Sequence, residues 1–270
     1  MQDLNVSLMQ TELFWENKTQ NLAHFSALIN SIIEQTDIIV LPEMFTTGFS
    51  MQPELFAETM SSETVKWMLH TAKEKDAVLT GSVIIKEGEK YYNRLIWAQP
   101  NGETFYYDKR HLFTLSSEEQ HYSAGKEKLM VKYKGWKICP LICYDLRFPV
   151  WCRNSRQTTG HRSQLQNGVY DLLLFVANWP EKRSAAWKTL LQARAIENQA
   201  YAIGVNRIGN DGNNIYHSGN SSVIDPMGDV VFSQSDLPFV KTFTLSKERL
   251  LFVREKLPFL NDADNYSINI

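Results

Sequence analysis

Apolar residues return at every third or fourth position in three segments of the chain, a spacing that predicts helices with one buried face. The three segments are residues 17–35, 63–75 and 185–199. In the first segment the apolar stripe continues to Ile33, and in the third it continues to Ile196, so we expect both side chains to be buried. A fourth helix is expected at residues 246–255, ahead of a polar tail.

Short apolar or alternating runs predict the strands. Two of them, at residues 37–42 and 172–176, are apolar almost throughout, as expected for strands that are covered on both faces. The other predicted strands are residues 5–10, 77–85, 91–98, 103–107, 129–133, 136–143, 201–206, 221–224, 229–232 and 240–245. Residues 154–168 are polar and lack apolar periodicity, so we expect a surface loop there.

The order of these elements predicts the architecture. Helices fall between groups of strands, and no linker, repeat or low-complexity segment divides the chain. We therefore expect residues 1–270 to form one domain of layered α/β type. A single sheet of this many strands would be very wide, so two sheets packed face to face and covered by helices are the more economical arrangement.

Composition and charge narrow the functional classes. The 270 residues are 43% hydrophobic and 21% charged, which is ordinary for a globular protein. A net charge of −2 gives no electrostatic reason to expect nucleic acid or an anionic membrane as a partner. No apolar run approaches the roughly 20 residues that cross a bilayer, and residues 1–5 lack the features of a signal peptide. Three cysteines form no obvious disulfide framework, so we expect a reduced, cytoplasmic protein.

Three predicted strands end in a chemically reactive side chain. Glu43 follows the strand at residues 37–42, Lys109 follows the strand at residues 103–107, and Cys143 ends the strand at residues 136–143. We expect these strand ends to converge on one cleft, which is the usual place for a site in α/β proteins.

The three side chains together can perform nucleophilic catalysis. A thiol attacks only when a base or a lowered pKa activates it. A buried carboxylate can carry the proton, and a fixed ammonium can stabilise both a thiolate and a tetrahedral oxyanion. The alternative for Cys143 is a buried thiol of the core, because free cysteine is among the most buried residue types. Its combination with Glu43 and Lys109 favours the nucleophile.

Longer segments surround these residues: Leu-Pro-Glu-Met-Phe at residues 41–45, Tyr-Asp-Lys-Arg-His-Leu-Phe at residues 107–113 and Cys-Tyr-Asp-Leu-Arg-Phe-Pro at residues 143–149. In this order they resemble the three signatures of the nitrilase superfamily of carbon–nitrogen hydrolases. Residues 193–199 and 225–228 also look like family segments, so the resemblance covers nearly the whole chain.

The resemblance implies an α-β-β-α sandwich, two copies of which pair about a two-fold axis as a homodimer. It implies that Glu43 is the general base, Lys109 the oxyanion stabiliser and proton donor, and Cys143 the nucleophile that carries a thioester intermediate. The backbone N–H of Tyr144 would be a second donor to the oxyanion. Neither a metal ion nor an organic cofactor is expected.

The resemblance also implies a second glutamate, in the loop before Gly125. Glu118 stands seven residues ahead of this glycine, which is the expected spacing. Glu119 lies beside it and leaves the register open. The alternative for either residue is a solvated acid in a surface loop.

Residues 143–151 and 177–180 most resemble the bacterial omega-amidases of this superfamily. The resemblance implies small amides of 2-oxo acids as substrates, namely 2-oxoglutaramate and 2-oxosuccinamate, whose carboxylate lies far from the amide. A guanidinium is the natural partner of such a carboxylate. The arginines that could bind it are Arg147, Arg183 and Arg207, each of which could instead be a surface or salt-bridged residue.

Two further features concern the rim of the expected pocket. Asn178 and Trp179 follow the strand at residues 172–176, so we expect them to line the pocket. Residues 154–168 form a longer segment than the family leads us to expect.

Four alternatives to an omega-amidase stay open. Another amidase of the superfamily, such as a deaminated glutathione amidase or a small aliphatic amidase, would use the same three residues. A cysteine–histidine hydrolase is possible because His111 lies close to Lys109. A metal site at Cys139, Cys143 and Cys152 is disfavoured, since spacings of four and nine differ from the close pairs of zinc sites. A redox-sensing thiol without catalysis would need neither the base nor the ammonium.

Overall fold

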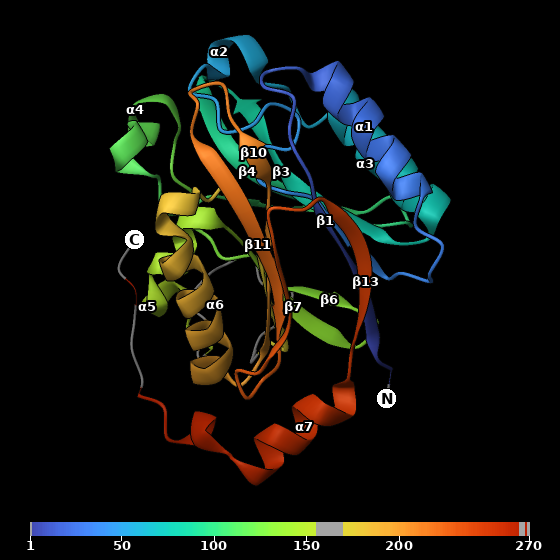
Figure 1. The fold of residues 1–270 in the computed structure, drawn as a ribbon, viewed down its shortest axis with the longest axis vertical. Coiled ribbons are helices and arrows are strands. Elements are labelled where there is room, and N and C mark those ends of the chain that lie inside the picture. The colour runs from blue at the N-terminus through green and yellow to red at the C-terminus, as the bar shows by residue number, and fades with distance from the viewer. Residues whose placement is uncertain (1, 155–169, 265–267, 269–270) are drawn as a thin grey trace.

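Two sheets lie face to face in the computed structural model, which describes residues 2–154, 170–264 and 268 (Figure 1). The strands of the first sheet are β1 (Leu4–Gln10), β2 (Ile38–Val40), β3 (Val78–Glu87), β4 (Lys90–Ala98), β5 (Thr104–Asp108) and β13 (Phe239–Leu245). Their order is β13-β1-β2-β3-β4-β5. β1, β2 and β3 run parallel to one another, and the other neighbours are antiparallel.

The second sheet places the strand that ends just before Cys143 near its edge. Its strands are β6 (Val131–Tyr133), β7 (Trp136–Ile142), β8 (Leu172–Ala177), β9 (Tyr201–Asn206), β10 (Ile208–Asn210), β11 (Tyr216–Ile224) and β12 (Val230–Ser235). Their order is β10-β11-β9-β8-β7-β6, and β12 pairs with β11. β7 and β8 are parallel and pair Ile142 with Val176, so Cys143 and Asn178 emerge at the same end of the sheet.

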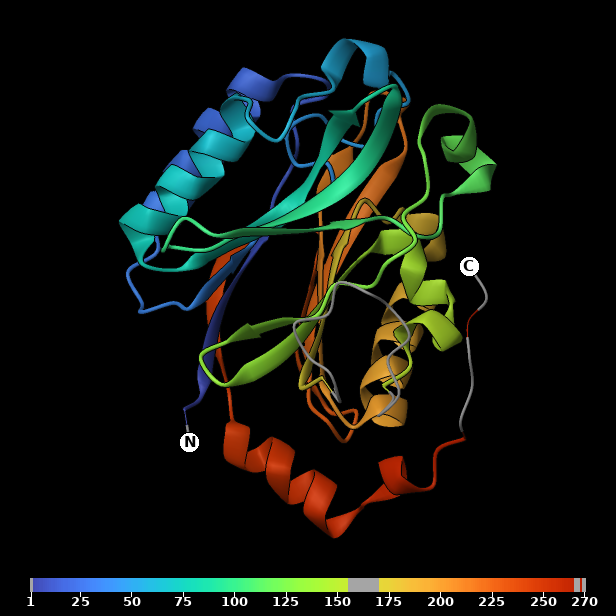
Figure 2. The same ribbon diagram turned by 180° about the vertical axis from the view of Figure 1, so that it is seen from behind.

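Helices cover the outer face of each sheet. α1 (Lys18–Asn30) and α3 (Glu63–Lys75) lie side by side on the first sheet, and α6 (Ser184–Asn198) lies on the second (Figure 1, Figure 2). The shorter helices are α2 (Pro53–Phe56), α4 (Glu118–His121), α5 (Pro149–Cys152), α7 (Lys247–Lys256) and the 3₁₀ turns η1 (Thr114–Ser116), η2 (Cys143–Arg147), η3 (Glu181–Arg183) and η4 (Phe259–Asn261). Within the described residues, no helix has the length and apolar character needed to span a membrane. The predicted α-β-β-α sandwich is confirmed.

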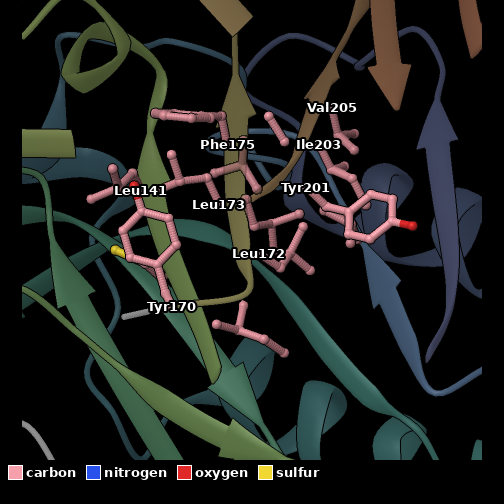
Figure 3. Packing of buried hydrophobic residues seen from close by; sticks show 14 of the residues in the cluster. Leu141, Tyr170, Leu172, Leu173, Phe175, Tyr201, Ile203 and Val205 are labelled. Carbon is pink, nitrogen blue, oxygen red and sulfur yellow. The ribbon is translucent and has the colours of Figure 1, made fainter. Parts of the chain in front are cut away.

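The apolar strands are buried on both faces, as their sequences require. In β2, Ile38 and Val40 belong to the core that includes both sheets, whereas Ile39 belongs to the core under α1 and α3. In the second sheet, Leu173 of β8 and Ile203 of β9 pack in the same cluster (Figure 3). Because side chains alternate across a strand, a strand with cores on both sides has no polar face.

The first helix is shorter than its apolar stripe predicts. α1 ends at Asn30, and Ile33 is 93% exposed, so the prediction of a buried Ile33 is wrong. The N–H of Asp37 already donates to the carbonyl of Asn5 at 2.8 Å, at the entrance to β2. The chain must therefore leave the helix and turn within a few residues, which leaves Ile33 on that turn.

The longest helix also differs from its predicted stripe. α6 buries Trp187, Leu191 and Ala195, which stand four residues apart and face β9 and β11. Ile196 is 53% exposed, so its predicted burial is wrong. One position beyond Ala195, it is turned by about 100° from the buried face and lies beside Gly228.

The end of the second sheet was only partly predicted. β10 is an additional strand, and β11 begins at Tyr216 instead of residue 221. This part of β11 carries polar residues at buried positions, so it lacks an apolar alternation from which a strand could be predicted. The predicted surface loop at residues 154–168 lies outside the described residues except for Asn154.

Candidate active site

Glu43 stands in a sharp turn directly after β2. The next residue, Met44, has a φ of 42°, a left-handed conformation that is costly for a residue other than glycine. The turn is held because the Met44 N–H donates to the Ser82 hydroxyl at 2.8 Å. Glu43 is fully buried. The strained conformation thus lies directly after the residue predicted to act as the base.

A lysine and two glutamates form one buried cluster. Lys109 directly follows β5, and its Nζ lies 2.9 Å from Glu43 Oε1. The same Nζ lies 3.0 and 2.9 Å from the two carboxylate oxygens of Glu118. Glu118 is fully buried at the start of α4, whereas Glu119 is exposed. The structure therefore places Glu118, and not Glu119, beside the lysine.

Asn93 on β4 contacts all three members of this cluster, although it lies in none of the motifs described above. Its Nδ2 donates to Glu43 Oε1 at 2.8 Å and lies 3.4 Å from Glu118 Oε1. Its backbone carbonyl accepts the Lys109 N–H at 3.0 Å. The only sequence signal is a polar residue at a position that the strand pattern places inside.

Asn178 and Phe113 donate further hydrogen bonds that hold Glu43 and Glu118 in place. The Asn178 N–H donates to Glu43 Oε2 at 2.8 Å, and its Nδ2 donates to the Glu43 carbonyl at 2.5 Å. The Phe113 N–H donates to Glu118 Oε2 at 2.6 Å. Asn178, which we expected only to line a pocket, thus joins the end of β8 to the turn that carries Glu43.

Cys143 begins η2 at the end of β7, as predicted. Its φ is 41°, so the backbone at this residue is also in the left-handed region. Cys143 is only 8% exposed to solvent. Burial raises the pKa of the thiol well above its usual range, and the neighbouring Glu43 charge and hydrogen bond act in the same direction, against the opposing charge of Lys109. The sulfur is therefore a thiol at rest, and a base must remove its proton during attack.

Burial and neighbouring charges shift the pKa values of Lys109 and Glu118. Burial alone would lower the pKa of Lys109, but the charges of Glu118 and Glu43 outweigh it and raise that pKa. Lys109 therefore stays an ammonium and cannot be the base. Burial raises the pKa of Glu118, against the opposing effect of Lys109. Glu43 is the carboxylate that contacts both the ammonium and the thiol.

A small cavity opens beside the thiol. Its volume is about 40 Å³, whereas one water molecule needs at least about 10–15 Å³ on this scale. The cavity therefore has room for a small molecule. It is lined by Phe49, Lys109, Phe113, Ser116, Cys143, Tyr144, Arg147, Asn178, Trp179, Pro180, Arg183, Asp211, Ile215 and His217.

Two of the three candidate arginines lie at this cavity. The Arg147 guanidinium lies 5.0 Å from the Trp179 ring centre, and the Arg183 guanidinium lies 4.9 Å from the Phe113 ring centre. Burial lowers the pKa of Arg183, and the nearby charge of Arg147 acts in the same direction. In the described part of the chain, neither arginine forms a salt bridge.

Arg207, the third candidate for the substrate carboxylate, does not line the cavity. It is fully buried, and its guanidinium donates to the carbonyls of Ile208 and Asn210 at 3.0 and 2.8 Å. Burial lowers its pKa to about 10. Its role is to hold the turn around β10.

The alternative chemistries receive no support from the geometry. His111 is absent from the cavity lining, and its Nδ1 lies 2.7 Å from Asp145 Oδ1. The Cys152 thiol donates to the Asp145 carbonyl at 3.2 Å, and burial raises the pKa of Cys139 to about 12. In residues 2–154, 170–264 and 268, no three His, Cys, Asp or Glu side chains are grouped so that they could hold a metal ion.

Comparison with known proteins identifies the family. A family model described as carbon-nitrogen hydrolase matches residues 5–238. The chain belongs to the carbon–nitrogen hydrolase family. The predicted membership of the nitrilase superfamily is confirmed, and with it the classification as a cysteine-dependent hydrolase of carbon–nitrogen bonds.

Individual carbon–nitrogen hydrolases match along the whole chain. Omega-amidase YafV of Yersinia enterocolitica is 43% identical, over 98% of this chain and 99% of that protein. 2-oxoglutaramate amidase of Bacillus subtilis is 31% identical, over 95% of this chain and 96% of that protein. The structure of XC1258 from Xanthomonas campestris, a CN-hydrolase superfamily protein with an arsenic adduct in its active site, is 42% identical and has a TM-score of 0.95 over the full length of both chains.

Proposed function

We propose that this protein is an omega-amidase, which hydrolyses the terminal amide of 2-oxoglutaramate or 2-oxosuccinamate to the dicarboxylic oxo acid and ammonia. The observation that carries the proposal is a small cavity that joins a buried thiol, carboxylate and ammonium to two arginines without acidic partners in the described residues. The relatives named omega-amidase and 2-oxoglutaramate amidase, which match along the whole chain, support it.

In the first half-reaction, Cys143 Sγ attacks the amide carbon while Glu43 takes the thiol proton. The carbonyl π electrons move to the oxygen, and a tetrahedral oxyanion forms. Its carbon–nitrogen bond then breaks, and the departing nitrogen takes the proton from Glu43. Ammonia leaves and a thioester remains on Cys143. The raised pKa of the thiol is the reason that proton removal must accompany the attack.

The oxyanion needs donors that are already in place. An ammonium has three N–H bonds. We assign one N–H of Lys109 to Glu43 and a second, shared one to the two oxygens of Glu118, which lie 2.9–3.0 Å from Nζ. The third is left for the oxyanion, because Lys109 also lines the cavity. The backbone N–H of Tyr144 is the second donor in this proposal.

The second half-reaction releases the acid. Glu43 takes a proton from water, and the resulting hydroxide attacks the thioester carbon. The carbon–sulfur bond breaks, and the sulfur recovers its proton from Glu43. The sum is amide plus water giving acid plus ammonia. No electron is transferred to or from the enzyme.

Arg147 and Arg183 are the residues that we propose bind the distant carboxylate of the substrate. Both line the cavity and both are oriented by an aromatic ring. Two guanidiniums close together repel each other, and an anion between them removes that repulsion. Asn178 and Trp179 line the same cavity, and we propose that they also contact the substrate.

The test is ammonia release from 2-oxoglutaramate, 2-oxosuccinamate, glutamine, deaminated glutathione and a simple nitrile. We expect the two oxo acid amides to be hydrolysed fastest. If another substrate is hydrolysed and both oxo acid amides are not, the omega-amidase assignment is wrong while the family assignment stands.

The nucleophile is tested separately. Cys143→Ala should abolish turnover on every substrate, and intact-mass measurement with a slow substrate should find an acyl group on Cys143. Full turnover by Cys143→Ala would refute the mechanism. So would an acyl group on Cys139 or Cys152.

We also propose that residues 1–270 form a single catalytic domain that works as a homodimer in the cytoplasm. The resemblance to the family supports the dimer, and the absence of a disulfide framework in the sequence supports a reducing compartment. Light scattering during size-exclusion chromatography should give a mass near twice that of one 31.2 kDa chain.

A further inference from the structure

A single buried carboxylate receives hydrogen bonds from both sides of the active site. Asp145 has no exposed surface. Its Oδ2 accepts the Tyr107 hydroxyl at 2.7 Å and the Ile142 N–H at 3.1 Å. Its Oδ1 accepts the His111 N–H at 3.0 Å and lies 2.7 Å from His111 Nδ1. Four donors thus surround one side chain.

The donors come from two segments of the chain, one around Lys109 and one around Cys143. Tyr107 lies two residues before Lys109, and His111 lies two residues after it. Asp145 lies two residues after Cys143, and Ile142 lies just before it. The carboxylate therefore fastens the segment that carries the ammonium to the turn that carries the nucleophile.

We propose that Asp145 and His111 are positioning residues that fix the distance between Cys143 Sγ and Lys109 Nζ. The inference rests on the roles proposed above for Cys143 and Lys109. A thiol and an oxyanion donor carried by different sheets have no covalent reason to keep a constant separation. The bonds to Asp145 supply that constraint, and they do so without contacting the substrate.

His111 is itself held rigidly against the nucleophile's turn. Its ring stacks on the Phe148 ring, with centroids 3.6 Å apart and planes inclined by 6°. The Trp151 ring meets it edge-on at 6.0 Å. The ring therefore cannot rotate freely, and the Nδ1 bond to Asp145 has a fixed direction.

In this geometry the His111 ring donates a hydrogen bond to Asp145. A carboxylate only accepts hydrogen bonds, so we assign the Nδ1 proton to the bond with Asp145. A histidine–aspartate pair next to a cysteine could also be a general base, but the His111 ring does not line the cavity. The two roles make opposite predictions for a variant that keeps the donor and loses the base.

Such a pair of variants is His111→Asn and His111→Ala. The asparagine amide can donate from near the position of Nδ1, but it cannot take up a proton at neutral pH. The alanine variant has neither property. We expect kcat for the oxo acid amide to fall about tenfold to a hundredfold in His111→Ala, with KM unchanged, and to recover to within a few-fold in His111→Asn.

A second measurement separates positioning from activation of the thiol. Iodoacetamide alkylates Cys143 with loss of iodide and transfer of the thiol proton to Glu43, and no oxyanion forms. The alkylation rate of Cys143 in His111→Ala should therefore stay within about threefold of wild type while amide hydrolysis falls. Peptide mapping identifies the labelled cysteine, and Cys143→Ala is the blank.

Tyr107→Phe and Tyr170→Phe form a matched pair of buried hydroxyl deletions. Tyr107 bonds Asp145, whereas the Tyr170 hydroxyl bonds the Cys152 carbonyl and has no link to the Lys109 segment. We expect kcat per alkylatable Cys143 to fall in Tyr107→Phe and to stay constant in Tyr170→Phe. The thermal unfolding midpoint of each variant is measured as a control, to show that the variant is folded at the assay temperature.

Three results would overturn the proposal. Equal inactivity of His111→Asn and His111→Ala, with alkylation lost in both, would make His111 the base. Unchanged kcat per alkylatable Cys143 in His111→Ala and Tyr107→Phe would leave only a structural role. Equal losses of kcat in Tyr107→Phe and Tyr170→Phe would point to general loosening of the core. None of these results depends on Cys143→Ala, whose retained activity would refute the proposed function instead.

Discussion

Lys109 is an ammonium between two buried carboxylates, so its charge serves the fold as well as the mechanism that we propose. Replacing it by methionine leaves Glu43 and Glu118 side by side without a cation. We expect Lys109→Met to lower kcat about 10²–10³-fold, the usual cost of removing an oxyanion donor. We also expect it to lower the free energy of unfolding by about 3–5 kcal/mol, because a buried ion pair has lost one partner.

Urea unfolding and steady-state kinetics check both effects. The control is Lys132→Met, which removes an exposed lysine on β6. Unfolding free energies that agree for the two variants would mean that the buried cluster does not need the ammonium.

At the other end of the cavity, Arg183 is predicted to select the substrate. We expect Arg183→Ala to raise KM for 2-oxoglutaramate about tenfold to a hundredfold, since a hydrogen bond between charged groups contributes about 1.5–3 kcal/mol. KM for butanamide, which has no carboxylate, should not change. Lys182→Ala, an exposed neighbour in η3, is the control. A parallel rise for both amides would assign Arg183 to the shape of the pocket.

The site shows which residues a sequence can reveal. Glu43, Lys109 and Cys143 could be predicted because each follows a strand and lies in a family signature. Asn93 could not, because its contacts depend on the antiparallel pairing of β4 with β5, which brings its carbonyl to Lys109. The spacing to Gly125 favoured Glu118 but left Glu119 open, and the burial of Glu118 beside Lys109 decides between them.

At the scale of elements, α6 and β9 are in unusually close contact at Gly204. A Cβ at this position would lie 2.5 Å from Trp187 Cζ2 and 2.6 Å from Leu191 Cδ1. We expect Gly204→Ala to lower the free energy of unfolding by about 1–3 kcal/mol, because α6 must move away from the sheet.

A double mutant tests that explanation. Trp187→Leu removes the ring that the new methyl group would meet. Denaturant unfolding of Gly204→Ala/Trp187→Leu should therefore give a loss smaller than the sum of the two single losses. Strict additivity would place the strain somewhere other than between these two residues.

The limits of the helices were harder to predict than their existence. The 63–75 helix agrees at both ends with α3, whose chain turns at Asp76 in a left-handed conformation. In α1 the apolar Ile33 lies past the last turn, and in α6 the apolar Ile196 lies just outside the buried face. The sequence contains the stripe, but only the path of the chain into the next strand decides which of its members are covered.

At the scale of the whole molecule, buried protonated groups predict sensitivity to alkali. Burial raises the pKa of Cys139 to about 12, from its usual value near 9, and it also raises that of Cys152. Above pH 9 the unfolded chain loses these protons while the folded chain keeps them. The folded state therefore binds more protons, and the free energy of unfolding falls as pH rises, by up to about 1.4 kcal/mol per pH unit for each thiol.

Urea unfolding at pH 8, 9, 10 and 11 measures this slope. In Cys139→Ala one of the thiols is gone, so the slope between pH 9 and 11 should be shallower than in the wild type. A slope that does not change in this variant would assign the alkaline loss to other groups, such as the buried phenol of Tyr107, whose pKa burial also raises.

The two guanidiniums at the cavity also affect how fast a substrate arrives. The chain has a net charge of −2, yet the described residues that line the cavity include Arg147 and Arg183 and only one carboxylate, that of Asp211. Such a local positive potential steers anions toward the cavity, and dissolved salt screens it over about 8 Å at physiological ionic strength. Added sodium chloride should therefore lower kcat/KM for 2-oxoglutaramate while kcat stays constant. For a neutral amide, kcat/KM should not depend on the salt concentration. The same enzyme would therefore capture its substrate faster in a dilute buffer than in a solution of high ionic strength.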